Sequence, residues 1–325
     1  MNIIKNFLIK ANTFPYMLML VLLCAQTSLS QEQKPEQVYV GIYLNQITSI
    51  SLKDNQFVAD FYIWFRWKDK DLNPLESFDV VNGHIESKEG VYHDKVNGFN
   101  YGACRVIATI KKFWDISRFP LDNHTLTIEI EDNDNEEFKL KYVPDTENSG
   151  TDPQVQVPGW KLGTTNATAS AHTYKTNYGD ISLPTNNASI YSRFIFSVNI
   201  IRPGYGYFFK LFFTVFVAAL VALIALFIKP TDLDPRFGLG AGALFAAVAS
   251  EVVIASLLPD TNIMTLTDKL HIISIFFIFL SIAESIVSLK LFASGKEEAS
   301  RRLDRICFYI FLVVYVVLNL AIIFS

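Results

Sequence analysis

The sequence predicts a two-part membrane protein, an all-β domain followed by a bundle of four transmembrane helices, and three observations predict it. Residues 31–203 are dense in β-branched and aromatic residues and carry more Asp and Glu than Lys and Arg. Residues 204–325 are mostly apolar and hold four segments long enough to cross a bilayer. Half of the 325 residues are hydrophobic and 18% are charged, which excludes a disordered chain and argues against a nucleic-acid partner.

Residues 1–30 have the pattern of a signal peptide. Two lysines precede the apolar run Met17–Leu23, and the small residues Ser28 and Ser30 offer a cleavage site. The run is much shorter than the roughly 20 residues that a span requires, which disfavours a first transmembrane helix. We therefore expect residues 31–203 to be extracellular or periplasmic.

Residues 31–203 are predicted to form strands. Four stretches rich in β-branched and aromatic residues stand out, at 57–67, 106–110, 125–130 and 191–201. Turn signals separate the stretches, among them Asn73-Pro74, Asn82-Gly83, Asn97-Gly98 and Pro158-Gly159. Short strands at this spacing predict an all-β sandwich or barrel.

The four predicted spans are each close to the roughly 20 residues required: 205–228, 237–258, 270–289 and 306–325. The loops after the first and third spans hold most of the Lys and Arg of this region. The positive-inside rule makes these two loops cytoplasmic, in agreement with the signal peptide. We expect a multi-pass protein of the plasma membrane, or of the inner membrane of a bacterium, with the N-terminal domain and the C-terminus outside.

The cysteines and histidines indicate no catalytic or metal chemistry. Of Cys24, Cys104 and Cys307 only Cys104 falls in the outer domain, so no disulfide is expected within it. The five histidines belong to no nucleophile or metal motif, and there is no Gly-rich phosphate loop. We expect neither an enzyme nor a cofactor.

Several short motifs occur in order along the chain. They are Trp67-Lys-Asp69, Phe119-Pro-Leu-Asp122, Arg202-Pro203 before the first span, and a second span that begins Pro235-Arg-Phe-Gly-Leu-Gly240 and ends at Pro259. With the topology, they resemble the pentameric ligand-gated ion channels, the family of the nicotinic and glycine receptors and their bacterial relatives. The family's loop disulfide is missing here, because Lys112 and Leu126 stand where its cysteines would fall, and so is the usual first-span proline. In lacking the disulfide, the chain resembles the bacterial members.

The resemblance implies an immunoglobulin-like sandwich, a homopentamer in the lipid bilayer, and a channel for small ions opened by a small ligand, a proton or a divalent cation. A membrane-anchored ligand-binding receptor that conducts no ions is the alternative. It stays open because only Asp234 and Ser256 would place polar groups along the expected pore.

Seven residues of the second span recur every three or four positions, which places them on one helix face: Asp234, Gly238, Gly242, Phe245, Ala249, Val252 and Ser256. By resemblance this face lines the pore, with Phe245 as a hydrophobic gate and Asp234 as an acidic ring that attracts cations. The glycines alone would equally suit a helix-packing seam. Arg236 favours anions if it faces the lumen, and we expect it to point away.

Glu251 and Glu284 are ionisable residues inside predicted spans, where such groups are costly and usually functional. Glu251 is off the lining face, and we expect it to face neighbouring helices with Lys210 or His271 as a partner or to sense protons. For Glu284, near the inner end of the third span, an ordinary interfacial position is an equal alternative.

Six acidic residues crowd the segment 129–137. By resemblance this segment is one ligand-binding loop, Tyr62 belongs to a second, and the segment 174–191 is a third. The predicted ligand residues are Tyr62, Glu129, Glu131, Asn133, Tyr174, Tyr178 and Tyr191. A cation site at Asp132, Asp134 and Glu136 is a further hypothesis, and a plain solvated loop is the alternative.

The resemblance also predicts where the outer domain meets the membrane domain. The loop 114–122, the junction at Arg202-Pro203 and the turn 259–267 would meet there. The predicted coupling residues are Asp115, Phe119, Pro120, Asp122, Arg202 and Pro259, and their alternative role is only to hold the interface together.

Overall fold

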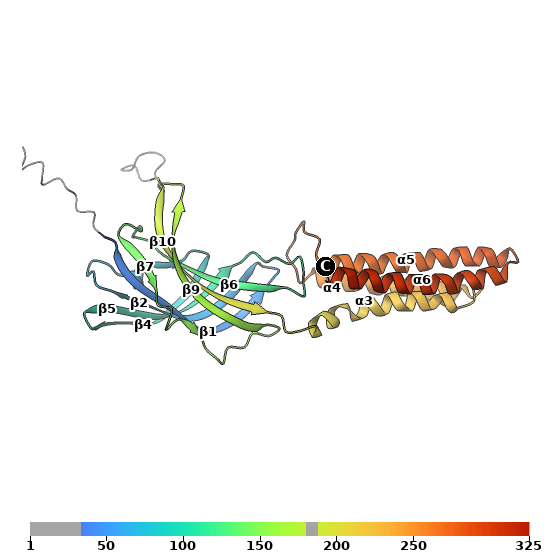
Figure 1. Cartoon of the computed structure of the whole chain (residues 1–325), viewed down its shortest axis with the longest axis horizontal. Coiled ribbons are helices and arrows are strands. Elements are labelled where there is room, and N and C mark those ends of the chain that lie inside the picture. The colour runs from blue at the N-terminus through green and yellow to red at the C-terminus, as the bar shows by residue number, and fades with distance from the viewer. Residues whose placement is uncertain (1–33, 180–187, 325) are drawn as a thin grey trace, which may run out of the picture.

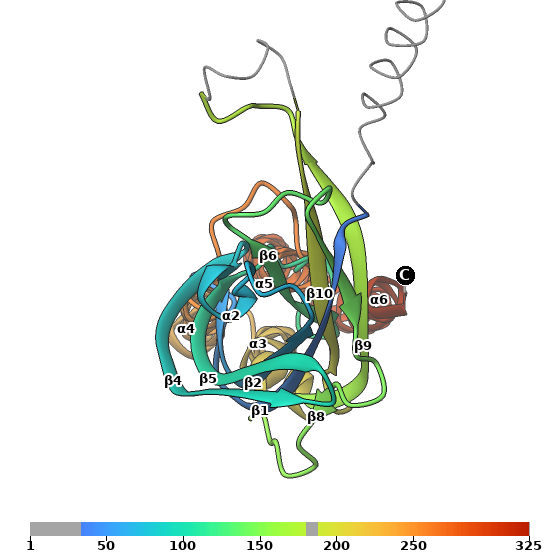
Figure 2. The ribbon, with the colours of Figure 1, turned by 90° about the vertical axis from the view of Figure 1, so that its left-hand side faces the viewer.

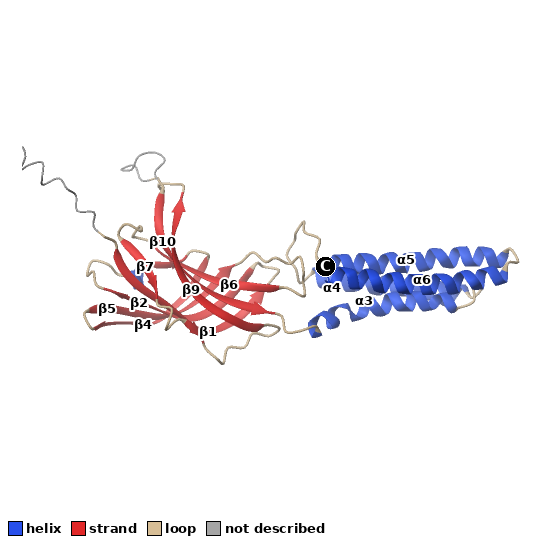
Figure 3. Ribbon diagram, in the orientation of Figure 1, coloured by secondary structure: helices blue, strands red, loops and turns tan. Residues whose placement is uncertain are grey.

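The computed structural model describes residues 34–179 and 188–324. The predicted signal peptide and the segment 180–187 lie outside the described residues. The molecule is elongated, with the strands in one half and the long helices in the other (Figure 1 and Figure 3). The end of the last helix lies at the junction between the two halves (Figure 1).

The strands form two sheets. The first has the order β4-β5-β2-β1-β7, with β8 also paired to β1, and the second has the order β3-β6-β10-β9. The first sheet consists of β4 (Gly83–Val96), β5 (Phe99–Lys111), β2 (Gln56–Trp67), β1 (Glu36–Ser51), β7 (Leu140–Pro144) and β8 (Gly150–Thr151). The second consists of β3 (Phe78–Val80), β6 (Asn123–Asp132), β10 (Ser189–Ile201) and β9 (Lys161–Tyr174), and the short helix α2 (Pro74–Ser77) precedes β3.

The two sheets form a sandwich-like domain. Seen end-on in Figure 2, the sheet of β4, β5, β2 and β1 curves around the side opposite β6, β10 and β9. Alternation explains the burial: in β10, Phe194, Phe196 and Val198 are buried while the residues between them are more exposed. Phe65 of β2 contacts Phe78 of β3 with ring centroids 5.3 Å apart, so the two inner faces share one core.

All four predicted strand stretches are confirmed, and the strands are longer than the sequence suggests. The predicted stretch 106–110 is the end of β5, which begins at Phe99. The turn signal Asn97-Gly98 joins β4 to β5, and both residues have positive φ values of 53° and 80°. This is the conformation that a tight hairpin requires and that Asn and Gly adopt most readily.

Four helices follow, each long and apolar enough to cross a membrane. They are α3 (Gly206–Ile224), which continues as a 3-10 turn η1 (Ala225–Phe227), α4 (Leu233–Ala255), α5 (Leu266–Ala293) and α6 (Glu297–Phe324). The chain is therefore a multi-pass membrane protein by the length and composition of its helices. Three helices, α4, α5 and α6, begin earlier than the predicted spans. α5 starts at a capping box between Thr265 and Asp268, and α6 starts with a charged turn, so polar residues extend both helices beyond their apolar segments.

Candidate functional site

An ion network lies on the outer surface of the second sheet, and Arg193 of β10 is its centre. The guanidinium of Arg193 donates to Glu129 Oε2 at 2.7 Å and to Glu131 Oε1 at 2.6 Å, both on β6. It also donates to the Tyr174 hydroxyl, which in turn donates to the second oxygen of Glu131. The three charged groups link β10 to β6, and the Tyr174 hydroxyl links both strands to β9.

Aromatic rings surround this network. The ring of Tyr174 contacts Tyr178, Tyr191 and His172 edge-on, with centroids 5.7, 5.8 and 4.6 Å apart. Burial and the hydrogen bond to Glu131 raise the pKa of Tyr174 above its ordinary value. Two carboxylates against one guanidinium leave one net negative charge beside aromatic faces, a combination suited to a small cation.

The structure brings together five of the seven predicted ligand residues: Glu129, Glu131, Tyr174, Tyr178 and Tyr191. Tyr62 lies on β2 in the other sheet and is 45% exposed, so one chain does not place it in the cluster. Asn133 is exposed in the following turn, where its backbone N–H donates to the Ser77 carbonyl. Sequence reasoning missed Arg193. Only the pairing of β10 with β6, across 62 residues of sequence, shows that it faces the two glutamates.

The proposed cation site at Asp132, Asp134 and Glu136 is not formed. Asp132 is buried, and its carboxylate accepts hydrogen bonds from the backbone N–H groups of Asp134 and Asn135 and from the Ser77 hydroxyl. These bonds organise the loop and use the oxygens that a cation would need. No group of three or more His, Cys, Asp and Glu side chains within residues 34–179 and 188–324 is placed to hold a metal ion.

Arg193→Met is expected to lower the free energy of unfolding of the outer domain by about 1.5–3 kcal/mol, because charged hydrogen bonds of this kind contribute that much. The measurement is the thermal unfolding of the purified protein. Lys139→Met, at an exposed position, is the matched control. Adding Glu131→Gln to Arg193→Met should restore part of the loss, since it removes a carboxylate left without its partner. An effect no larger than that of Lys139→Met would contradict the role given to Arg193.

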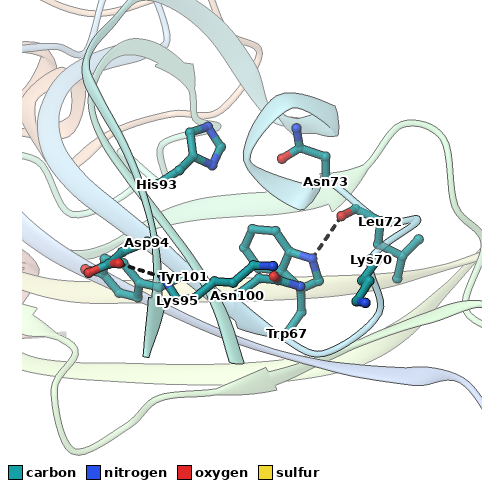
Figure 4. Close-up of a pocket in the computed structure, with 9 residues that line it drawn as sticks. All are labelled: Trp67, Lys70, Leu72, Asn73, His93, Asp94, Lys95, Asn100 and Tyr101. Atoms are coloured by element: carbon teal, nitrogen blue, oxygen red, sulfur yellow. Dashed lines mark hydrogen bonds between the residues drawn. The ribbon is translucent and has the colours of Figure 1, made fainter. Parts of the chain in front are cut away.

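A cavity of about 600 Å³ lies elsewhere in the outer domain, between the start of α2 and the β4–β5 hairpin (Figure 4). Trp67 forms its floor and donates its indole N–H to the Leu72 carbonyl at 2.9 Å. Lys70, His93 and Lys95 supply polar groups at the rim. None of the predicted ligand residues lines this cavity, so it is separate from the Arg193 network.

A second network, formed by Asp122, His124 and Arg202, is buried where the outer domain meets the helices. Asp122 accepts from His124 Nε2 at 2.6 Å and from Arg202 Nε at 2.8 Å, and all three side chains are less than a tenth exposed. Burial raises the pKa of Asp122, but the hydrogen bonds and charges of His124 and Arg202 outweigh it and hold the pKa below its ordinary value. Arg202 also lies over the rings of Trp160, Phe119 and Tyr207.

The loop 114–122, which ends at Asp122, also contacts the helices directly. The carbonyl of Ser117 accepts from the backbone N–H of Leu266 at 2.8 Å, and the carbonyl of Phe119 accepts from the Thr267 hydroxyl at 3.0 Å. Arg118 donates to the carbonyl of Ile323, near the end of α6. These bonds join the outer domain to α5 and α6.

The predicted coupling residues divide into two groups. Phe119, Asp122 and Arg202 lie at the junction as expected, next to Pro120, which is buried and follows a cis peptide bond. Asp115, also predicted as a coupling residue, forms no ion pair within the described residues. It is exposed, and its carboxylate accepts from Ser117, which lowers its pKa. Pro259 lies in the turn between α4 and α5 and has no hydrogen bond to the outer domain within the described residues. The sequence analysis missed His124, although it stands two positions after Asp122.

The predicted pore face of α4 is exposed along its whole length in the single chain, from Asp234 through Gly238, Gly242, Phe245, Ala249 and Val252 to the cap residue Ser256. The other side of the helix packs on its neighbours through Arg236, Gly240, Ala243, Ala247 and Ile254. A Cβ at Gly238 or Gly242 would meet no atom within 4 Å, whereas one at Gly240 would lie 2.8 Å from Ile282. Within one chain, therefore, the packing glycine is Gly240.

Arg236 points away from the exposed face into the bundle, as expected. Its guanidinium donates to Glu284 of α5 at 3.1 Å, to Asp304 of α6 at 2.6 Å and to the Ile228 carbonyl at 2.9 Å. Arg236 is fully buried and the two carboxylates nearly so, so Glu284 faces the interior of the bundle. Glu251 does not pair with Lys210 or His271 in the described part of the chain. The ring of His271 instead bonds the Thr267 carbonyl and the Ser250 hydroxyl.

No protein-family model matches the chain, and no curated protein matches it.

Proposed function

We propose that this chain is the subunit of a homopentameric ligand-gated ion channel. In this proposal the outer domain is an immunoglobulin-like sandwich on the extracellular or periplasmic side. Five copies of α4 surround a pore with Phe245 as its gate and Asp234 at its inner mouth, and small cations pass through it. Binding of a small ligand or of protons at the outer domain opens the gate through the Asp122 junction.

The exposed face of α4 is the observation that carries the proposal. Between its two polar ends, Asp234 and Ser256, it carries the small residues Gly238, Gly242 and Ala249. Its larger side chains are Val252 and the ring of Phe245, which is 77% exposed. The exposed face of α6 is different, because it carries bulky residues such as Tyr309, Ile310 and Val313, which suit contact with lipid. Small and polar residues along a membrane helix favour contact with protein or water over lipid. A central pore would supply that environment.

The Arg193 network supports the ligand-binding part of the proposal. It joins the carboxylates of Glu129 and Glu131 on β6 to tyrosine rings at the end of β9 and the start of β10. Tyr62, exposed on the other sheet, would reach the same site from a neighbouring subunit in a ring. A positively charged ligand such as a primary amine fits these groups best.

Recording current in planar bilayers containing the purified protein tests the proposal. Phe245→Ala is expected to raise the current without added ligand, because a smaller side chain widens and hydrates the hydrophobic constriction. Val253→Ala is the matched control, since Val253 is 63% exposed on α4 but lies off the proposed face. In a salt gradient the reversal potential should shift toward that of the cation, and Asp234→Ala should reduce the shift.

Other outcomes would change the assignment. An anion-directed reversal potential would keep the channel and overturn the role of Asp234. Silence of both the native protein and Phe245→Ala at every pH and with every amine or calcium added would favour the alternative, a membrane-anchored receptor that conducts no ions. Equal effects of Phe245→Ala and Val253→Ala would contradict a pore on this face.

A further inference from the structure

A groove of about 480 Å³ opens at the end of the helical bundle that lies away from the strands (Figure 1). Three parts of the chain line it. The end of α3 and the turn after it contribute one wall, Phe292 of α5 a second, and the first turns of α6 a third. The charged lining residues are Lys229, Arg301, Asp304 and Arg305. No residue of the proposed pore face or of the Arg193 network lines it.

The groove presents positive charge to its surroundings. Lys229, Arg301 and Arg305 are all exposed. Arg301 pairs with Glu297 one turn earlier, whereas neither Lys229 nor Arg305 has an acidic partner within the described residues. The carboxylate of Asp304, the one acid in the lining, is nearly buried and bonds Arg236 at 2.6 Å. It is therefore engaged with Arg236 and forms no ion pair with Lys229 or Arg305.

Apolar surface adjoins these cations. The ring of Phe227 is 55% exposed and contacts Phe308 of α6 with centroids 4.5 Å apart. Both rings belong to helices long and apolar enough to span a membrane. Cations at the rim and exposed rings just beyond them match a molecule with an anionic head and apolar chains. A free anion would leave the rings uncovered.

We propose that this groove binds an anionic phospholipid of the surrounding bilayer. The lipid phosphate lies between Lys229 and Arg305, and Arg301 adds charge at the rim. The acyl chains run along Phe227 and Phe308. Charge at a membrane surface strengthens such binding by about fivefold for each Lys or Arg. The proposal rests on insertion in a membrane and does not depend on channel activity.

The test is thermal unfolding of the full-length protein in detergent micelles with increasing fractions of phosphatidylglycerol or of zwitterionic phosphatidylcholine. Phosphatidylglycerol should raise the unfolding temperature more. The double variant Lys229→Gln/Arg305→Gln should need at least about tenfold more phosphatidylglycerol for the same rise. The matched control is Lys210→Gln/Arg302→Gln, which removes two exposed charges outside the groove and should behave like the native protein.

Three outcomes would overturn the proposal. Equal stabilisation by the two lipids would show that the charge of the lipid is not recognised. An equal loss in the control double variant would show general attraction to the protein's positive charge. The same rise with inorganic phosphate alone would assign the groove to a free anion and not to a lipid.

Discussion

Arg236→Met is expected to lower the free energy of unfolding by about 3–5 kcal/mol, the cost of breaking a buried ion pair from one side. The substitution keeps an apolar side chain of similar length but removes the positive charge that pairs with both Glu284 and Asp304. One oxygen of Glu284 already has no hydrogen-bond partner in the described structure, so this carboxylate has little to replace the guanidinium. Two uncompensated carboxylates would then share one buried space among α4, α5 and α6.

Thermal unfolding in detergent, followed by the loss of helical circular dichroism, measures the effect. Arg302→Met is the matched control, because Arg302 is an exposed arginine at the same end of the bundle. The triple variant Arg236→Met/Glu284→Gln/Asp304→Asn should recover much of the loss, since neutral groups replace the whole cluster. If Arg236→Met and Arg302→Met unfold at the same temperature, the cluster does not hold the helices together.

This cluster shows what the sequence reveals of the helical bundle and where it stops. The four spans are predictable because each apolar segment is as long as a bilayer is thick. The starts of α5 and α6 are not predictable, because the first turns of these helices are polar and hydropathy assigns such turns to loops. That Arg236 meets Asp304 depends on the packing of helices 68 residues apart in sequence. A single charged residue in a span indicates that a partner exists, but not which one.

In the outer domain, too, the sequence predicts local features but not the contacts between residues far apart in the chain. Alternation in β10 predicts which side chains enter the core, so Arg193 could be assigned to the outer face. Its contact with Glu131 follows from strand register, which the sequence does not encode locally. Composition misled us at Asp132, where a cluster of acids looked like a cation site. Hydrogen bonds from the loop's own backbone and from Ser77 use that carboxylate. Acidic composition alone does not distinguish a ligand set from a loop that binds itself.

Asp122→Asn is expected to cost about 3–5 kcal/mol of stability near neutral pH, because it leaves the nearly buried Arg202 without its counter-charge. Measuring the stability of the native protein and the variant at several pH values distinguishes the effect of the Asp122 charge from the effect of the side chain's shape. The pKa of Asp122 is lowered in the folded protein, so its charge stabilises the fold fully above the ordinary carboxyl pKa of about 3.9. That contribution is lost as the pH falls through the lower folded-state value. The difference between native protein and variant should therefore be constant from pH 7 to 5 and shrink below pH 4.

Asp115→Asn is the control for this prediction, since Asp115 belongs to the same loop but is exposed and bonds only Ser117. It should change the unfolding temperature little at any pH. A difference for Asp122→Asn that stays constant down to the lowest pH would mean that the fit of the side chain, and not its charge, stabilises the junction. If the charge is what matters, then Asp122, His124 and Arg202 form one electrostatic unit.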